Sequence, residues 1–267
     1  MAANSRKSWG LAAAGAMLTG AYYLYRENTA VDVEPIPVVL KNLPPAFNGM
    51  KIAVVSDVHL PRCHLSPEKL AHLVELQRPD AIFLPGDLTN SYDDLDTRGL
   101  GELAGRLAAI APCAAVPGNH EWRHGRIRDY VRILSRAGVR VLLDRATTLE
   151  REGQAVTVYG VGRRRPAAMP EDRPRPILAI AHRPERLPYY AKAHWDLVVC
   201  GHAHGGQVRI GKQGLFAPEQ GLLPRYVSGL YRQGETQMVV SRGLGNSSFP
   251  LRFGNRLHLP ILILAGA

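Results

Sequence analysis

Cysteine is scarce in this sequence. The 267 residues include three cysteines, an odd number without the paired spacing that thiolate metal sites show. Two of them, Cys113 and Cys200, lie in apolar runs, which is typical of buried thiols that act as small hydrophobic side chains. The composition therefore argues against a disulfide framework.

Other features are absent as well. The chain has no internal repeat, no basic patch interleaved with aromatic residues and no recognition-helix pattern. Acidic residues number 23 against 33 lysines and arginines, which gives a net charge of +10. A basic chain can bind nucleic acid, an anionic membrane face or a phosphate-bearing substrate. We expect no nucleic acid as a partner. An anionic membrane face and a phosphate-bearing substrate remain open, as does a basic surface without a specific partner.

The N-terminal segment lacks charge from position 9 to position 25. Its length is at the short end of the roughly 17–25 residues that span a bilayer, and aromatic residues stand near both of its ends. We interpret residues 1–26 as an apolar membrane anchor or an uncleaved signal. A cleavable signal peptide and a buried soluble helix are the alternatives. Arg6 and Lys7 precede the segment and Arg26 follows it, which leaves the side of the membrane open.

The sequence pattern of the remaining chain changes twice. Residues 27–50 predict a connector and an edge strand. From residue 51, strand-like apolar runs alternate with helical segments, one of which has Ser66 as a plausible cap and Pro67 at its first position. From residue 139, short strands dominate. The pattern predicts an α/β fold in which a parallel core is covered by a second, mostly β layer.

Polar side chains stand where five apolar runs end. The runs VVSD, FLPGD, AVPGNH, LAIAH and LVVCGHAH all end in, or run directly into, Asp, Asn or His. Sites in open α/β sheets form beyond the carboxyl ends of the strands, so these ends should meet at one rim. The residues concerned are Asp57, His59, Asp87, Asn119, His120, His182, His202 and His204.

Two pairs in this set, Asp57 with His59 and His202 with His204, are spaced two residues apart. In extended backbone such residues point to the same side, so each pair is expected to offer two ligands to one place. The neighbouring glycines let the backbone turn and approach closely. The spacing therefore predicts metal ligands rather than structural histidines.

The residue types narrow the choice of metal. Imidazole nitrogens, carboxylates and an amide oxygen suit borderline divalent ions such as Mn, Fe, Zn or Ni. The groups are too many for one tetrahedral ion, which favours two ions that share a carboxylate. Two ions at roughly 3.5–4 Å separation clamp the attacking and leaving oxygens of a phosphoryl displacement. We therefore expect two divalent metal ions and phosphoryl chemistry.

Taken in order, these motifs resemble the signature of the calcineurin-like metallophosphoesterases. The resemblance covers roughly residue 51 to the C-terminus, with D-x-H at 57–59, GD at 86–87, GNHE at 118–121, His182 and GHAH at 201–204. It implies a four-layer α/β/β/α sandwich of two mixed sheets, of the metallo-dependent phosphatase type. Residues 51–267 are accordingly expected to form a metallophosphoesterase domain with a binuclear metal centre.

The resemblance also implies a division of the ligands. One ion would bind Asp57, His59, Asp87 and His204. The other would share Asp87 and bind Asn119, His182 and His202. His120 matches the family histidine that contacts the scissile phosphate and helps the leaving oxygen depart, so it is the expected catalytic residue.

Three arginines are candidate substrate contacts. Arg183 follows His182, and Arg242 and Arg252 lie in the stretch SRGLGNSSFPLRF. Guanidinium groups match the geometry of phosphate, although an ordinary surface salt bridge is an equally open interpretation for each.

GHAHGGQ, residues 241–253 and the N-terminal apolar segment are similar to a membrane-anchored bacterial branch of this family. That branch includes enzymes that hydrolyse UDP-2,3-diacylglucosamine, a lipid A precursor. The resemblance implies hydrolysis of a phosphodiester or pyrophosphate in a membrane-proximal lipid or nucleotide-lipid, by a protein anchored at the bacterial inner membrane. A phosphomonoesterase and a non-catalytic metal-binding scaffold are the alternatives.

Overall fold

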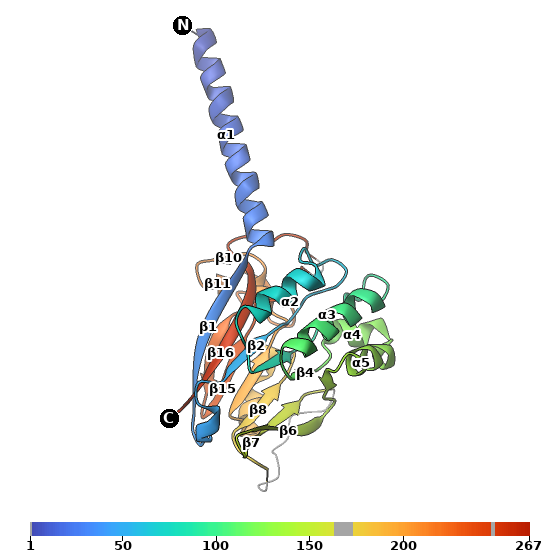
Figure 1. Cartoon of the computed structure of the whole chain (residues 1–267). Coiled ribbons are helices and arrows are strands. Elements are labelled where there is room, and N and C mark those ends of the chain that lie inside the picture. Colours follow the sequence, from blue (N-terminus) through green and yellow to red (C-terminus); the bar gives the residue numbers. More distant parts are fainter. Residues whose placement is uncertain (1, 163–172, 247–248) are drawn as a thin grey trace.

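Two mixed sheets packed face to face form the centre of the molecule (Figure 1). The computed structural model describes residues 2–162, 173–246 and 249–267, and the side chains from residue 14 onward within them. The Arg/Pro-rich sequence at 162–176 predicts a loop, and residues 163–172 of it lie outside the described residues. Helices cover the outer face of each sheet, which makes the four-layer α/β/β/α sandwich. The predicted fold class is confirmed.

The first sheet has six strands, four of which form a parallel run. Strand β16 pairs parallel with β1 on one side and antiparallel with β2 on the other. In spatial order the strands are β1 (Val31–Leu40), β16 (Leu257–Gly266), β2 (Lys51–Val54), β3 (Ala81–Leu84), β4 (Cys113–Ala115) and β5 (Arg140–Val141). The helices beside it are α2 (Pro67–Glu75), α3 (Thr97–Ile110), α4 (Asn119–His124) and α5 (Ile127–Arg136).

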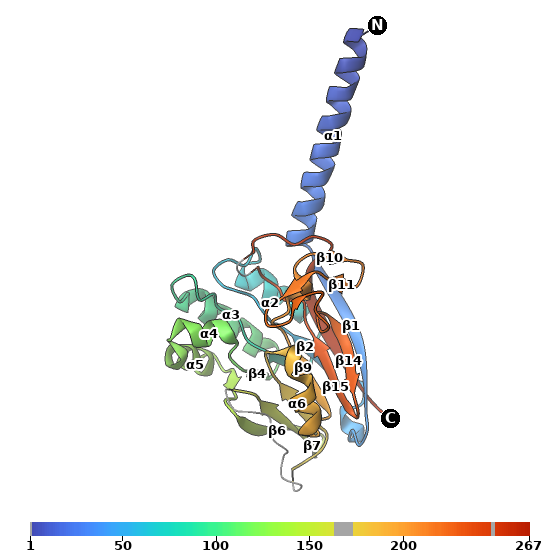
Figure 2. The ribbon, with the colours of Figure 1, turned by 180° about the vertical axis from the view of Figure 1, so that it is seen from behind.

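The second sheet also has six strands, with antiparallel pairs at both edges. Its spatial order is β14 (Gly229–Gln233), β15 (Thr236–Val240), β9 (Leu197–Cys200), β8 (Ile177–Ile180), β7 (Gln154–Gly160) and β6 (Arg145–Arg151). Helix α6 (Leu187–Lys192) packs on its outer face (Figure 2).

Short elements fill the connections. The 3₁₀ helices are η1 (Pro45–Phe47), η2 (Pro184–Arg186) and η3 (His204–Gly206). Two small hairpins follow η3, formed by β10 (Arg209–Ile210) with β11 (Gln213–Gly214) and by β12 (Phe216–Ala217) with β13 (Gly221–Leu222).

Local sequence explains these elements. The Ser66 side chain accepts a hydrogen bond from Lys69 N, and Pro67 begins α2, so the predicted cap is present. Strands β3, β8 and β9 are buried at every position, which is why they read as unbroken apolar runs. Apolar side chains from both inner faces form one core, and a separate core lies between each sheet and its helices.

Residues 27–50 contribute a strand to the first sheet and side chains to the core, which is more than a connector would do. Strand β1 lies at the edge of the first sheet, as expected, but Ile36, Val38 and Leu40 are buried between the sheets. Strand β1 pairs with β16 from Val31–Leu257 to Leu40–Gly266. The first and last strands of the sandwich therefore support each other.

Helix α1 (Ala2–Thr29) extends away from the sandwich (Figures 1 and 2). It is longer than the uncharged segment and runs into residues assigned above to the connector. Its last turn is fixed to the domain through the buried Glu27 and Asn28. Among the residues that the structure describes, no helix has both the length and the apolar character for crossing a bilayer.

Candidate metal centre

Five loops that leave the strands meet at one end of the two sheets. They follow β2, β3, β4, β8 and β9, so both sheets contribute. The aspartates and histidines of the sequence motifs on these loops are at most 6% exposed. The structure brings together Asp57, His59, Asp87, Asn119, His120, His182, His202 and His204.

Asp57, His59 and His204 form one group, the His59 cluster, whose ligand atoms all lie within 4.8 Å of one another. Nε2 of His204 is 3.0 Å from Nε2 of His59 and 3.6 Å from Oδ1 of Asp57. Burial lowers the pKa of His59 to about 3, so this ring is neutral. Neutral imidazole nitrogens converging beside a carboxylate are a suitable donor set for a divalent ion.

Asp87, His182 and His202 form the second group, the Asp87 cluster. Nε2 of His182 lies 3.2 Å from Oδ2 of Asp87 and 2.9 Å from Oδ1 of Asn119. Burial opposes charge on both Asp87 and His182, but their mutual attraction raises the pKa of His182 to about 9 and holds that of Asp87 well below its usual range. Nδ1 of His182 lies 2.8 Å from the Pro85 carbonyl oxygen, which turns Nε2 toward the oxygen ligands.

Asp87 also reaches the first cluster. Its Oδ2 is 4.0 Å from Nε2 of His59 and 4.0 Å from Nε2 of His120. A carboxylate within reach of both sets of imidazoles is placed to be a ligand shared by two ions.

The residues present fit two divalent ions. Burying two aspartates and several imidazoles this close together is costly unless a metal is coordinated. Nδ1 of His59 has no hydrogen-bond partner among the described residues. One ion would be held by Asp57, His59, Asp87 and His204. The other would be held by Asp87, Asn119, His182 and His202.

The backbone at the paired ligands differs from the expected one. Instead of extended backbone, φ is 51° at Asp57, 55° at His59, 69° at His202 and 46° at His204, all in the left-handed region. The chain turns sharply at both pairs. Asp57 and His59 still offer ligand atoms to one cluster, as expected, but the expectation is wrong for His202 and His204. His202 consequently joins the Asp87 cluster and His204 the His59 cluster. Non-glycine residues adopt this conformation only where surrounding contacts offset its cost.

Glycine is required where these loops cross, as Gly118 and Gly201 show. A Cβ atom at Gly118 would collide with Oδ1 of Asp87 and with the ring of His182. A Cβ atom at Gly201 would collide with the carboxylate of Asp57. The glycines beside the motifs thus let the loops approach the ligands.

His120 is oriented by Ser91. Its Nδ1 accepts a hydrogen bond from the backbone N–H of Ser91 at 3.0 Å. The neutral ring therefore carries its proton on Nε2, the nitrogen that faces Asp87. Burial lowers the pKa of His120, so the ring is neutral at pH 7 and presents an N–H donor to the site.

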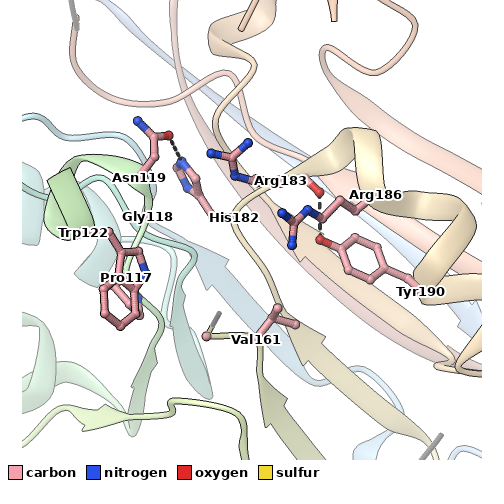
Figure 3. Close-up of a pocket in the computed structure, with 10 residues that line it drawn as sticks. Pro117, Gly118, Asn119, Trp122, Val161, His182, Arg183, Arg186 and Tyr190 are labelled. Carbon is pink, nitrogen blue, oxygen red and sulfur yellow. Dashed lines mark hydrogen bonds between the residues drawn. The ribbon is translucent and has the colours of Figure 1, made fainter. Parts of the chain in front are cut away.

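A cavity of about 350 Å³ opens beside Asn119 and His182. Figure 3 shows these two residues between Trp122 on one side and Arg183 and Arg186 on the other. The cavity gives a small anionic group access to one edge of the buried ligands.

Comparison with known proteins points to the same chemistry. The sequence profile described as "Calcineurin-like phosphoesterase" matches residues 50–206. The chain belongs to the calcineurin-like phosphoesterase family. The family and the two buried clusters make it a metal-dependent phosphoester hydrolase.

Three relatives of this phosphoesterase illustrate its range. Phosphodiesterase YaeI of Escherichia coli (strain K12) is 32% identical over 226 residues, 80% of this chain and 82% of that protein. Uncharacterized metallophosphoesterase YkoQ of Bacillus subtilis (strain 168) is 27% identical over 260 residues, 90% of this chain and 94% of that protein. "Transmembrane protein with metallophosphoesterase domain" of Bos taurus is 27% identical and is matched over 88% of this chain and 57% of its own length.

Glu121 of this phosphoesterase holds the carboxylate loops together. Its carboxylate accepts hydrogen bonds from the backbone N–H groups of Asp87 at 2.9 Å, Thr89 at 2.9 Å and Gly118 at 2.7 Å. It thereby ties the loop after β3 to the loop after β4. Its place within GNHE carries no signal of this role in the sequence.

The three arginines expected at the substrate occupy different places. Arg183 lines the cavity, and its Nη1 lies 2.9 Å from Oε1 of Glu219. Arg242 instead pairs with β1, through Asp32 at 3.0 Å. Arg252 is completely buried, with Nη2 3.3 Å from Nδ1 of His204. Within the described residues, Arg183 borders the cavity beside the ligands, whereas Arg242 is paired with half-exposed acidic residues of β1 and Arg252 is enclosed by the protein.

Glu219 is a neighbour of the site that sequence analysis missed. It lies between β12 and β13, and its carboxylate contacts Nε2 of His202 as well as Arg183. The hydrogen bond with His202 is the main reason that the pKa of Glu219 falls to about 2. No local motif marks this position, because its partners are brought to it only by the tertiary fold.

Proposed function

We propose that this phosphoesterase hydrolyses a phosphodiester or a pyrophosphate in a membrane-proximal substrate. The observation that carries the proposal is the cavity with Arg183 and Arg186 directly beside His182 and Asn119. Two guanidinium groups next to the metal ligands favour a substrate with anionic or polar groups on both sides of the scissile phosphorus. The similarity to a protein named phosphodiesterase YaeI supports the same choice.

Each nearby residue then has a role in the proposed reaction. Asp57, Asp87 and the imidazoles hold the metals, for which we propose Mn, Fe, Zn or Ni. When bound, two such ions supply Lewis-acid stabilisation of the charge that develops on the phosphate oxygens. His120 donates a hydrogen bond from its Nε2–H toward the leaving oxygen. Arg183 binds a phosphate oxygen in place of Glu219.

A pair of chromogenic esters tests the substrate class. With Mn²⁺ bound, we expect faster hydrolysis of bis(p-nitrophenyl) phosphate than of p-nitrophenyl phosphate. Arg183→Ala should lower kcat/KM for the diester by about 10- to 100-fold, because a hydrogen bond to a charged group contributes roughly 1.5–3 kcal/mol. Arg232→Ala, on the exposed part of β14, is the matched control and should change little.

Two outcomes of that assay would favour the alternatives. Faster hydrolysis of the monoester would indicate a phosphomonoesterase. Turnover of neither ester by a protein shown to contain two ions would indicate a metal-binding scaffold, since the ligands would then be present without the reaction.

We further propose that the protein is held at the bacterial inner membrane by the uncharged segment within α1. Support comes from the missing charge between residues 9 and 25 and from similarity to a relative named as a transmembrane protein. Deletion of residues 2–25 removes no proposed ligand and leaves Glu27 and Asn28 in place. The deleted protein should leave the membrane fraction and still hydrolyse a soluble ester. If it pellets with membranes in high salt, the segment is not the anchor.

A further inference from the structure

A set of exposed apolar side chains surrounds the base of α1. Their exposure is high for such residues, with Leu222 81% and Ile210 72% exposed. Large apolar side chains concentrated on one face of a soluble domain mark an interaction site. We call this set the apolar rim, and it consists of Ile210, Leu222, Leu223, Phe249, Leu251 and Phe253.

Backbone hydrogen bonds join the parts of the rim. Gln207 donates from its side chain to the carbonyls of Phe249 and Leu251, both at 3.0 Å. Leu223 N donates to Leu215 O, and Leu215 N donates to Val208 O. The loop 249–253 and the hairpins β10–β11 and β12–β13 therefore form one continuous surface.

The rim is continuous with α1. The rings of Tyr23 and Phe253 lie edge to face, with centroids 5.5 Å apart. Asn28 accepts a hydrogen bond from Arg252 N at 2.8 Å. Figures 1 and 2 both place β10 and β11 directly below the point where α1 leaves the domain. Tyr22 and Tyr25, which neighbour Tyr23 in the same helix, are also exposed.

Positive charge accompanies the apolar side chains. Arg26, Lys212 and Arg225 are exposed at or next to the rim. Aromatic and aliphatic residues mixed with Lys and Arg are typical of surfaces that enter the interfacial region of an anionic bilayer. A folded protein partner would have to leave room for a 28-residue helix that projects from the same end, whereas a bilayer that takes up α1 surrounds it on every side.

We propose that the apolar rim rests in the interface of an anionic lipid bilayer, so that the domain itself contacts the membrane in addition to α1. This inference rests on the proposed membrane-proximal function. The rim lies next to the site, because the hairpin that carries Leu222 also carries Glu219 to His202 and Arg183. Asn255, two residues after Phe253, donates to the His204 carbonyl at 2.7 Å. A rim seated in lipid therefore brings the cavity to the level of the headgroup phosphates.

Fluorescent labels on the full chain test the proposal. Leu222→Cys and Leu251→Cys are each labelled with a polarity-sensitive nitrobenzoxadiazole dye and added to phosphatidylcholine–phosphatidylglycerol vesicles. The native Cys113 and Cys200 are buried and Cys63 is mostly so, and the unsubstituted chain measures their background labelling. The control is Glu152→Cys, an exposed position in the β6–β7 turn at the far end of the domain (Figure 1).

We expect both rim labels, and not the control label, to shift to shorter wavelength and to be quenched by doxyl-labelled lipid. If the rim labels stay as accessible to iodide as the control label while the protein floats with vesicles, α1 alone makes the contact and the proposal is overturned. A wavelength shift without lipid quenching that grows with protein concentration would mean that a second copy covers the rim, which also overturns it.

A charge substitution separates this proposal from the proposed reaction. Leu222→Glu with Leu223→Glu should lower hydrolysis of a vesicle-embedded phosphodiester by at least about tenfold, since each leucine loses its apolar contact with lipid. Hydrolysis of soluble bis(p-nitrophenyl) phosphate should remain within about twofold, because neither residue contacts a ligand. If the double variant and the unsubstituted chain hydrolyse the embedded substrate at equal rates, the proposal for the rim is overturned and the proposed reaction is unaffected. Absence of soluble turnover in the unsubstituted chain would instead overturn the proposed reaction.

Discussion

The two halves of the metal centre are held in different ways. In the first sheet, Asp87 is fixed by neighbours within the same half, since Glu121 binds its backbone N–H and His120 N donates to its Oδ1 at 2.9 Å. In the second sheet, the loop of His202 and His204 is fixed by residues far along the chain. Asn255 binds the carbonyls of His204 and Gln207. We call the first-sheet part the carboxylate half and the second-sheet part the imidazole half. Asp87 is thus fixed within the carboxylate half, whereas the imidazole half depends on remote segments.

The largest difference between the halves should appear on removing one ligand from each. Asp87→Ala removes the carboxylate within reach of both clusters, so we expect loss of both ions and of measurable turnover. His204→Ala should release mainly the ion of the His59 cluster. Metal analysis of purified protein measures this. Two ions per chain in Asp87→Ala would show that Asp87 is not shared.

His120 sharpens the comparison, because it belongs to the carboxylate half without being an expected ligand. His120→Ala should lower turnover by roughly 10²–10³-fold while metal content stays normal, since a hydrogen-bond donor to the leaving oxygen is lost. The measurement is kcat together with metal content. If the metal is lost in parallel with activity, His120 coordinates an ion. His124→Ala, on the same helix, is the matched control.

Two isosteric substitutions compare the residues that orient the ligand loops in each half. Glu121→Gln places an amide N–H where three backbone N–H groups converge, and Asn255→Asp places a carboxylate against two carbonyls. Each should cost about 10- to 100-fold in metal affinity or activity, as loss of a group that orients ligands does. Calorimetric titration with Mn²⁺ should show both ions weakened by Glu121→Gln and mainly one by Asn255→Asp. If Glu121→Gln weakened mainly one ion and Asn255→Asp weakened both, the comparison of the two halves would be contradicted.

The smallest effect on turnover is expected from a substitution of His258. Its Nδ1 accepts a hydrogen bond from the backbone N–H of Arg242, which lies in the C-terminal segment that supports the imidazole half. Burial lowers its pKa from 6.5 to about 4. The unfolded chain therefore binds more protons between these values, and the free energy of unfolding falls as the pH falls below 6.5. From pH 7 to pH 5 the loss from this group is about 2 kcal/mol. Urea unfolding should show a flatter pH dependence in His258→Gln, with turnover at pH 7 unchanged. An unaltered slope would mean that this ring does not titrate as described.

The carboxylate half could be predicted further than the imidazole half. Asp57, Asp87 and Asn119 follow apolar strands directly, so strand ends alone indicate where they meet. The left-handed turns at His202 and His204 could not be predicted, because they are maintained by contacts with Asn255 and other distant residues. Glu219 lacked any local signal for the same reason.

The three candidate substrate arginines show the same limit of prediction from sequence. Arg183 follows a ligand in sequence and lines the cavity next to it. Arg242 and Arg252 lie in a segment held by Glu27, Asn28 and β1, so local sequence does not indicate that Arg242 pairs with β1 and that Arg252 is buried. Composition suggests a phosphate contact for any arginine, and only the tertiary fold decides among them.

The pairing of β1 with β16 has a consequence for biosynthesis. Strand β1 leaves the ribosome long before its partner, so the first sheet keeps an unpaired edge until residues 257–266 have been made. The segment that orients His204 directly precedes β16, so it too emerges late. A nascent chain therefore carries every proposed ligand before the segment that orients His204 has been made.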